Sequence, residues 1–221
     1  YTATGDGSFT EVTYLSAGGG GWGIDLGDIN QDKQLDIAIG DHLDGAKSWL
    51  NQGAGKFVAS HSGLPQGAYS GVGLADLNGD GHLDMLLGAD QFQTGFRLAF
   101  GDGAGSWSLQ DPTGLPLLGD KNPDGPLNVG NIHFADYDCD GDLDVFAFGL
   151  KPSKGGFSAF VYQNGGDGLA WTRVALLVAN SRVGAGSPFQ GSVGDVNADG
   201  QLDIAVGGSI FVFDGKQWTQ A

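Results

Sequence analysis

The chain has 221 residues, which is enough for one domain or for an array of small repeats. It carries 26 acidic and 10 basic residues, a net charge of −16, so nucleic acid and anionic membranes are poor partners for it. No apolar run approaches the length of a membrane span, which argues against membrane insertion, and the single cysteine, Cys139, allows no intrachain disulfide.

Almost all of the acid is aspartate, because Glu11 is the only glutamate beside 25 aspartates. Short Asp side chains suit turns and metal-binding loops. Fourteen of the 26 acidic residues lie in four short segments. A surface that is acidic only for solubility does not explain this clustering.

The N-terminal residues 1–17 contain a glycine turn that ends in an aromatic, at residues 5–9, with strand-like residues around it up to Tyr14. No acidic segment precedes this turn, so we interpret residues 1–17 as the outer half of a repeat unit. No basic-then-apolar leader precedes Tyr1, and we therefore expect a mature form or a trimmed piece of a protein.

Four acidic loops then follow the pattern D-x-[DN]-x-D-[GK]-x-L-D. We call them loops 1 to 4; they occupy residues 28–36, 76–84, 136–144 and 195–203, and they begin 48, 60 and 59 residues apart. Such self-similarity indicates a repeat architecture.

Strand-like segments flank each loop. Short Gly-bounded apolar runs follow the loops at residues 37–40, 85–88, 145–149 and 204–207, and these are typical of buried strands. Glycine turns that end in an aromatic come next, at residues 53–57, 101–107, 165–171 and 214–218. Each unit therefore has the order strand, acidic loop, strand, connector, strand, glycine turn, strand. The recurring aromatics could be ligand platforms, but their regularity favours one core side chain per repeat.

Four strands in each such unit match the size of a propeller blade. The sequence thus predicts an all-β, β-propeller-like array of four-stranded antiparallel blades, with four full blades and an N-terminal half blade. The predicted repeats span residues 1–17 for the half, then 18–66, 67–117, 118–180 and 181–221 of a single domain or fragment.

Calcium binding is the chemistry that these loops favour, because Ca²⁺ takes six to eight oxygens in flexible geometry. Positions 1, 3 and 5 would supply Asp or Asn oxygens, position 7 a backbone carbonyl, and position 9 a further carboxylate; Gly at position 6 allows a positive φ. The candidate ligands are Asp28, Asn30, Asp32, Gln34 and Asp36; Asp76, Asn78, Asp80, His82 and Asp84; Asp136, Asp138, Asp140, Asp142 and Asp144; and Asp195, Asn197, Asp199, Gln201 and Asp203. Up to four Ca²⁺ ions follow.

Other interpretations of the loops are weaker. An EF-hand needs a bidentate Glu at position 12, where these loops have Ile39, Leu87, Ala147 and Val206, and it needs flanking helices. Magnesium is disfavoured because it tends to keep its waters. Asx turns that need no metal remain the alternative. Loop 3 is richest in acid, whereas Lys33 at position 6 of loop 1 predicts backbone strain and the weakest site.

The loops, with the apolar strand and the glycine–aromatic turn behind them, resemble the FG-GAP/VCBS repeat over nearly the whole chain. The resemblance implies blades of a β-propeller, as in integrin α-subunits and some fungal and bacterial lectins. It also implies calcium between the first two strands of a blade, held by positions 1, 3, 5, 7 and 9. It carries over no sugar or peptide site. Propellers of this family often have seven blades, so the chain could be a fragment, a small ring, or an arc closed by self-association.

Three functions remain open. The first is a non-catalytic calcium-binding recognition module, extracellular or at the cell surface, with a carbohydrate or protein ligand; its candidate contact loops are residues 117–131 and 179–190. The second is a calcium-stabilised structural or adhesive segment of a larger surface protein. The third, an enzyme such as a hydrolase or lyase, is least favoured, because no nucleophile motif or phosphate loop accompanies the four histidines.

Overall fold

The protein is all-β over the residues described by the computed structural model, namely 2–3, 8–10, 15, 20–90, 95–117, 128–151, 156–179 and 191–221. These residues contain no helix, and accordingly none that is long and apolar enough to cross a membrane. Residues 5–7 of the glycine turn predicted at residues 5–9 lie outside the described residues, as do 118–127 and 180–190 of the two candidate contact loops.

Sixteen of the strands form four separate antiparallel sheets, each a four-stranded meander. Sheet 1 contains β3 (Gly21–Gly27), β4 (Asp36–Asp41), β5 (Gly45–Asn51) and β6 (Phe57–Ala59). Sheet 2 contains β7 (Tyr69–Ala75), β8 (Asp84–Ala89), β9 (Phe96–Gly101) and β10 (Trp107–Gln110). Sheet 3 contains β11 (Asn128–Ala135), β12 (Asp144–Lys151), β13 (Gly156–Asn164) and β14 (Trp171–Val178). Sheet 4 contains β15 (Gly191–Gly194), β16 (Asp203–Val206), β17 (Ser209–Phe213) and β18 (Trp218–Gln220).

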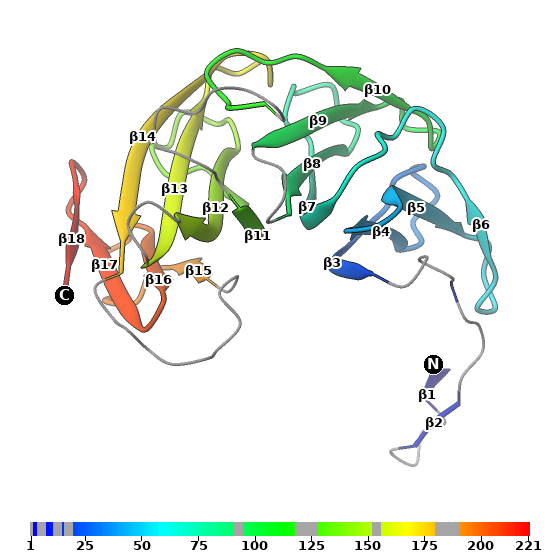
Figure 1. Cartoon of the computed structure of the whole chain (residues 1–221), viewed down its shortest axis with the longest axis horizontal. Coiled ribbons are helices and arrows are strands. Elements are labelled where there is room, and N and C mark those ends of the chain that lie inside the picture. Colours follow the sequence, from blue (N-terminus) through cyan, green and yellow to red (C-terminus); the bar gives the residue numbers. More distant parts are fainter. Residues whose placement is uncertain are drawn as a thin grey trace.

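This arrangement confirms the predicted strand order, with an acidic loop between the first two strands and a glycine turn between the last two. Near the N-terminus, β1 (Thr2–Ala3) and β2 (Phe9–Thr10) form a separate two-stranded sheet. The sheets stand side by side along an arc, with β3, β7, β11 and β15 on its inner side and β6, β10, β14 and β18 on its outer side (Figure 1).

The core consists of three apolar layers between successive sheets. Ala38 of sheet 1 packs with Met85 and Leu87 of sheet 2, and similar clusters fill the next two junctions. Glycine permits the close approach of the inner strands: a Cβ on Gly73 would collide with the ring of Phe134 in the next sheet. The whole arc is therefore held by face-to-face packing of its sheets.

Two connectors also tie the sheets together through a short motif that the sequence prediction missed. The segments Ser62-Gly63-Leu64-Pro65 and Thr113-Gly114-Leu115-Pro116 follow β6 and β10, and we call them staples. The carbonyls of Ser62 and Thr113 accept hydrogen bonds from Trp107 N (3.1 Å) and Trp171 N (2.9 Å), each at the start of the outer strand of the next sheet.

The other end of each staple binds back to its own side of the junction. The carbonyl of Pro65 accepts a hydrogen bond from Ala46 N of sheet 1 (3.1 Å), and that of Pro116 accepts one from Phe96 N of sheet 2 (2.8 Å). Each staple thus links the third strand of one sheet to the fourth strand of the next. The tryptophans that they cover, Trp107 and Trp171, are buried, as the interpretation of these aromatics as core side chains predicts.

Candidate functional site

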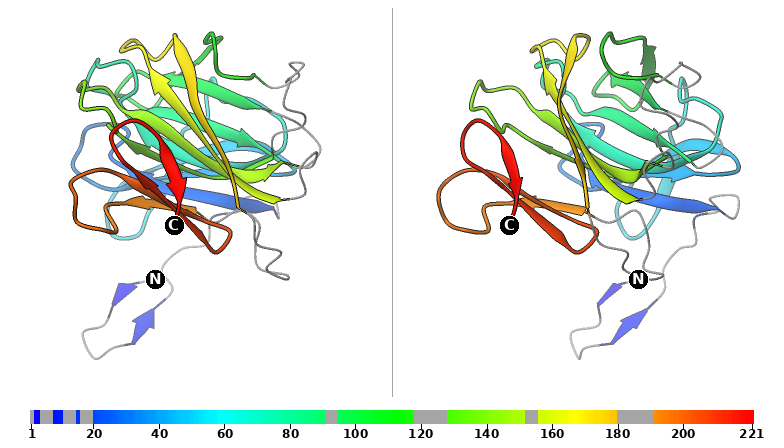
Figure 2. Two further views of the ribbon diagram at one scale, coloured as in Figure 1. Left: turned by 90° about the vertical axis from the view of Figure 1, so that its left-hand side faces the viewer. Right: turned by 60° about the vertical axis from the view of Figure 1, so that its left-hand side comes forward.

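The four acidic loops join the first and second strand of each sheet, so all four lie at the same end of the sheets (Figure 2). They share one backbone conformation, with positive φ at positions 4 and 6. Position 4 is Gln31, Gly79, Cys139 or Ala198, with φ between 60° and 74°; position 6 is Lys33, Gly81, Gly141 or Gly200, with φ between 69° and 98°. The positive φ at position 6 is as predicted, and Lys33 adopts it at 69°. The positive φ at position 4 was not predicted, because only loop 2 has a glycine there, Gly79.

The first aspartate of every loop folds the loop around itself. In loop 1 the two carboxylate oxygens of Asp28 accept hydrogen bonds from Asp32 N (2.9 Å) and Lys33 N (2.8 Å). Asp76, Asp136 and Asp195 accept the equivalent pairs of bonds in the other loops. These bonds wrap the backbone of each loop around the carboxylate of its first residue.

The fifth residue closes the turn in the same way in all four loops. In loop 2, Oδ1 of Asp80 accepts the backbone N–H of His82 at position 7 (2.8 Å). At position 3, Asn78 Nδ2 donates to the other Asp80 oxygen (3.0 Å), and the asparagines of loops 1 and 4 do likewise. Loop 3 differs, because its third residue is Asp138, which has no such proton to donate.

The ninth residue, although predicted only as a metal ligand, also braces each sheet. Asp36, Asp84, Asp144 and Asp203 are all fully buried. One oxygen accepts the N–H of loop position 2 and the other accepts the N–H of the last residue of the third strand. The bonds run from Ile29 and Asn51 to Asp36, from Leu77 and Gly101 to Asp84, from Tyr137 and Asn164 to Asp144, and from Val196 and Phe213 to Asp203, at 2.8–3.1 Å.

We call these four buried aspartates braces. Burial sets the protonation behaviour of two of them. It raises the pKa of Asp84 and of Asp144 from 3.8 to about 6, against the lowering effect of two backbone hydrogen bonds to each. Exposed Asp195 shows the opposite, since the hydrogen bond from Gly200 N lowers its pKa. In loop 3, burial and the charge of Asp140 raise the pKa of Asp138. The loops therefore concentrate negative charge that a cation would relieve.

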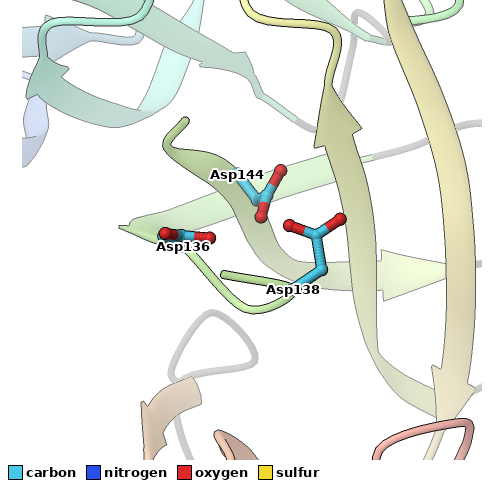
Figure 3. A group of neighbouring side chains, drawn as sticks. All are labelled: Asp136, Asp138 and Asp144. Carbon is cyan, nitrogen blue, oxygen red and sulfur yellow. The ribbon is translucent and has the colours of Figure 1, made fainter. Parts of the chain in front are cut away.

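Loop 3 brings three carboxylates together most closely. Oxygen atoms of Asp136, Asp138 and Asp144 all lie within 4.8 Å of one another (Figure 3). Hard oxygen donors at this spacing fit Ca²⁺, which prefers carboxylates and carbonyls over nitrogen or sulfur ligands. In loops 1, 2 and 4 the corresponding group combines two carboxylates with an asparagine, so the donors are again oxygens.

Loops 1 and 2 also contact each other, a link that was not predicted. Gln31 Nε2 donates to the carbonyl of Gly81 (2.8 Å) and lies 3.1 Å from Nδ1 of His82. The side chain of His82 thus lies between loops, while its predicted ligand is its carbonyl. The other histidines contact backbone carbonyls: His42 that of Gly20, His61 that of Ser48 and His133 that of Gly191 in the next sheet.

Comparison with known proteins supports this architecture in part. Residues 36–87, from β4 through loop 2 into β8, match the model of the FG-GAP-like repeat. No sequence among the curated proteins matches the chain. The structure is similar to that of a lectin from Agrocybe aegerita, described by its specific recognition of non-reducing terminal N-acetylglucosamine, with a TM-score of 0.54 and 18% identity. The match covers 89% of this chain and 50% of that one, so the chain spans about half the length of the lectin. At this identity the likeness shows the fold alone.

Proposed function

We propose that the protein is a non-catalytic recognition module whose loops 1 to 4 each hold Ca²⁺. The observation that carries the calcium proposal is the repetition of one loop geometry four times, with the same hydrogen bonds to positions 1, 5 and 9. A set of turns needed only to reverse the chain does not require a carboxylate or amide oxygen at positions 1, 3 and 5 of every copy. The acidic cluster of loop 3 supports the same conclusion.

We further propose that the four sheets are blades of a β-propeller, which rests on their arrangement along an arc and on the fold likeness to the lectin (Figure 1). Calcium would rigidify the loop end of each blade, and the surfaces between blades would bind a carbohydrate or protein ligand. The millimolar calcium outside cells suits such loops, so we place the module in an extracellular or cell-surface setting. A structural or adhesive segment of a larger surface protein is the second candidate, because the chain spans half of the similar lectin.

Calorimetric titration of the EDTA-treated chain with CaCl₂ tests the metal proposal. We expect saturable binding at up to four sites, and a higher melting temperature in calcium than in EDTA, because an ion bound only by the folded state stabilises it. Asp138→Ala should remove one site and leave the braces intact, whereas Asp111→Ala, at an exposed acid outside the loops, should change neither. Equal melting temperatures in calcium and EDTA would contradict the proposal.

A glycan array in calcium tests the recognition proposal. Selective retention of particular glycans would favour a carbohydrate ligand. A blank array, with calcium binding intact, would move the function to protein binding or to a structural segment.

A further inference from the structure

One junction of the arc differs from the other two, and the difference begins in the connectors. The staples that cover Trp107 and Trp171 follow β6 and β10, strands of three and four residues. β14 instead continues for eight residues. Leu176 and Leu177, which follow Trp171 by about as many residues as the staples follow the starts of β6 and β10, remain paired with β13. No [ST]-G-L-P motif occurs in residues 171–221. The aromatic of sheet 4, Trp218, is accordingly only half buried, whereas Trp107 and Trp171 are buried.

A cavity of about 720 Å³ lies at this junction, between β14, loop 3 and the β17–β18 hairpin. The hairpin and β14 lie at the same end of the arc (Figure 1), and residues of both line the cavity. The volume of the cavity falls within the range of small-molecule sites, roughly 300–1,000 Å³. The cavity thus lies at the junction where the described residues contain no staple.

The apolar side of the cavity is aromatic. Trp218 stacks on Phe213, with ring centroids 4.3 Å apart and planes at 29°, and Tyr137 contacts both rings. All three line the cavity, with the aliphatic side chains of β14 opposite them. Rings that pack on each other in this way are held in fixed orientations, which suits the recognition of a rigid ligand with an apolar face.

The polar side of the cavity carries hydrogen-bond donors and acceptors. The carboxylate of Asp138, a proposed calcium ligand, and the ammonium of Lys216 both line it, with the amides of Gln201 and Gln217. Such a set suits a ligand rich in hydroxyl groups. The net charge of −16 on the chain disfavours an anion.

From this geometry we propose that the cavity between β14 and the β17–β18 hairpin binds a neutral saccharide unit. The sugar would place its C–H face on the aromatic side and its hydroxyls against Lys216, Gln217 and Asp138. The inference rests on the recognition function proposed above and assigns it to one junction. The other two junctions are crossed by staples.

The test uses the full chain with calcium and a panel of glucose, galactose, N-acetylglucosamine and N,N′-diacetylchitobiose, followed by amide chemical-shift mapping. We expect at least one sugar to shift the amides of Lys216, Gln217 and Leu176. The double variant Lys216→Ala, Gln217→Ala should weaken binding by about tenfold, the loss expected for two hydrogen bonds of ordinary strength. Ala175→Phe, which fills the cavity from β14, should abolish it.

Matched controls separate the site from general damage. Lys56→Ala alters an exposed lysine in the hairpin of sheet 1, and Thr172→Phe adds the same ring at an exposed position of β14 outside the cavity lining. Both should bind the sugar as the unaltered chain does. Sugar binding that shifts other residues and survives the cavity variants would overturn the inference and leave the recognition function standing. A chain that binds no sugar of the panel but retains a protein ligand would overturn the saccharide assignment alone.

Discussion

At the scale of single residues, Lys33 shows how far loop 1 departs from the other loops. It holds φ at 69°, a region that costs a side chain with a Cβ about 1–2 kcal/mol. Its charge also lies in the loop where a cation would bind. The two effects can be separated by comparing two variants that both lack the charge.

We expect Lys33→Gly to be more stable than Lys33→Ala by about 1 kcal/mol, because only glycine relieves the strained φ. Both variants should bind calcium in loop 1 more tightly than the unaltered chain, because both remove a competing cation. Denaturant unfolding in EDTA measures the first effect and calorimetry the second. Equal stabilities of the two variants would show that the backbone at this position is not strained.

Calcium affinity should fall as the pH is lowered below about 6. The pKa of Asp84 and of Asp144 is raised by burial to about 6 in the metal-free fold, so calcium must displace a proton below that pH. The same shift means that the fold holds these protons more tightly than the unfolded chain. Without calcium, their contribution to stability therefore decreases as the pH rises from about 4 to about 6.

Titrations at pH 5 and pH 7, in buffers of different ionisation enthalpy, measure both the affinity and the protons released. We expect weaker binding and greater proton release at pH 5. Asp84→Ala removes one of the two groups and should reduce the pH dependence. An affinity that is unchanged between the two pH values would contradict the raised pKa of these carboxyls in the metal-free fold.

At the scale of elements, the braces and the staples decide how the sheets hold together. A brace ties its loop to the third strand of its own sheet, as Asp36 ties Ile29 to Asn51. A staple ties neighbouring sheets, as Pro65 and Ser62 tie Ala46 to Trp107. The braces therefore stabilise individual sheets, and the staples stabilise the contacts between neighbouring sheets.

Gly114 lies in the second staple, where an added Cβ would collide with the backbone carbonyl of Trp171. We therefore expect Gly114→Ala to destabilise the protein by about 2–4 kcal/mol. Gly215→Ala is the matched control. It has nearly the same φ, 83° against 79°, but a Cβ there would meet nothing within 4 Å, so we expect a loss of about 1 kcal/mol. Chemical denaturation measures both. Equal losses would mean that the staple has room for a methyl group.

At the scale of the whole molecule, the first sheet presents an apolar face that has no counterpart at the inner junctions. Ile24 and Leu26 of β3 are 65% and 52% exposed. The equivalent face of sheet 2, with Val72 and Leu87, is buried against sheet 1. We propose that sheet 4 of a second copy packs on this face and continues the arc toward a closed ring.

Sedimentation velocity over a range of concentrations tests this self-association. We expect the unaltered chain to associate, and the double variant Ile24→Lys, Leu26→Lys to remain monomeric, because two buried charges would oppose the contact. Val58→Lys, Leu109→Lys changes two residues of similar exposure on outer strands and should associate normally. A monomeric unaltered chain at all concentrations would contradict the proposal.

The sequence by itself determined the four loops, the strand order and the oxygen chemistry of the candidate metal site. These depend on nine-residue patterns and on residue periodicity, which act over short stretches of chain. The FG-GAP-like match at residues 36–87 agrees with them, and the positive φ at Lys33 followed from the same pattern.

Only the tertiary structure decided what the buried aspartates and the aromatics do. Asp144 accepts a hydrogen bond from Asn164, 20 residues away, and Thr113 covers Trp171 across a junction of sheets. Neither pairing follows from a local pattern, because each depends on where another sheet comes to rest. The glycine turns therefore end in similar aromatics, yet Trp171 is buried under a staple and Trp218 faces a cavity, since β14 stays in its own sheet and does not cross to the next.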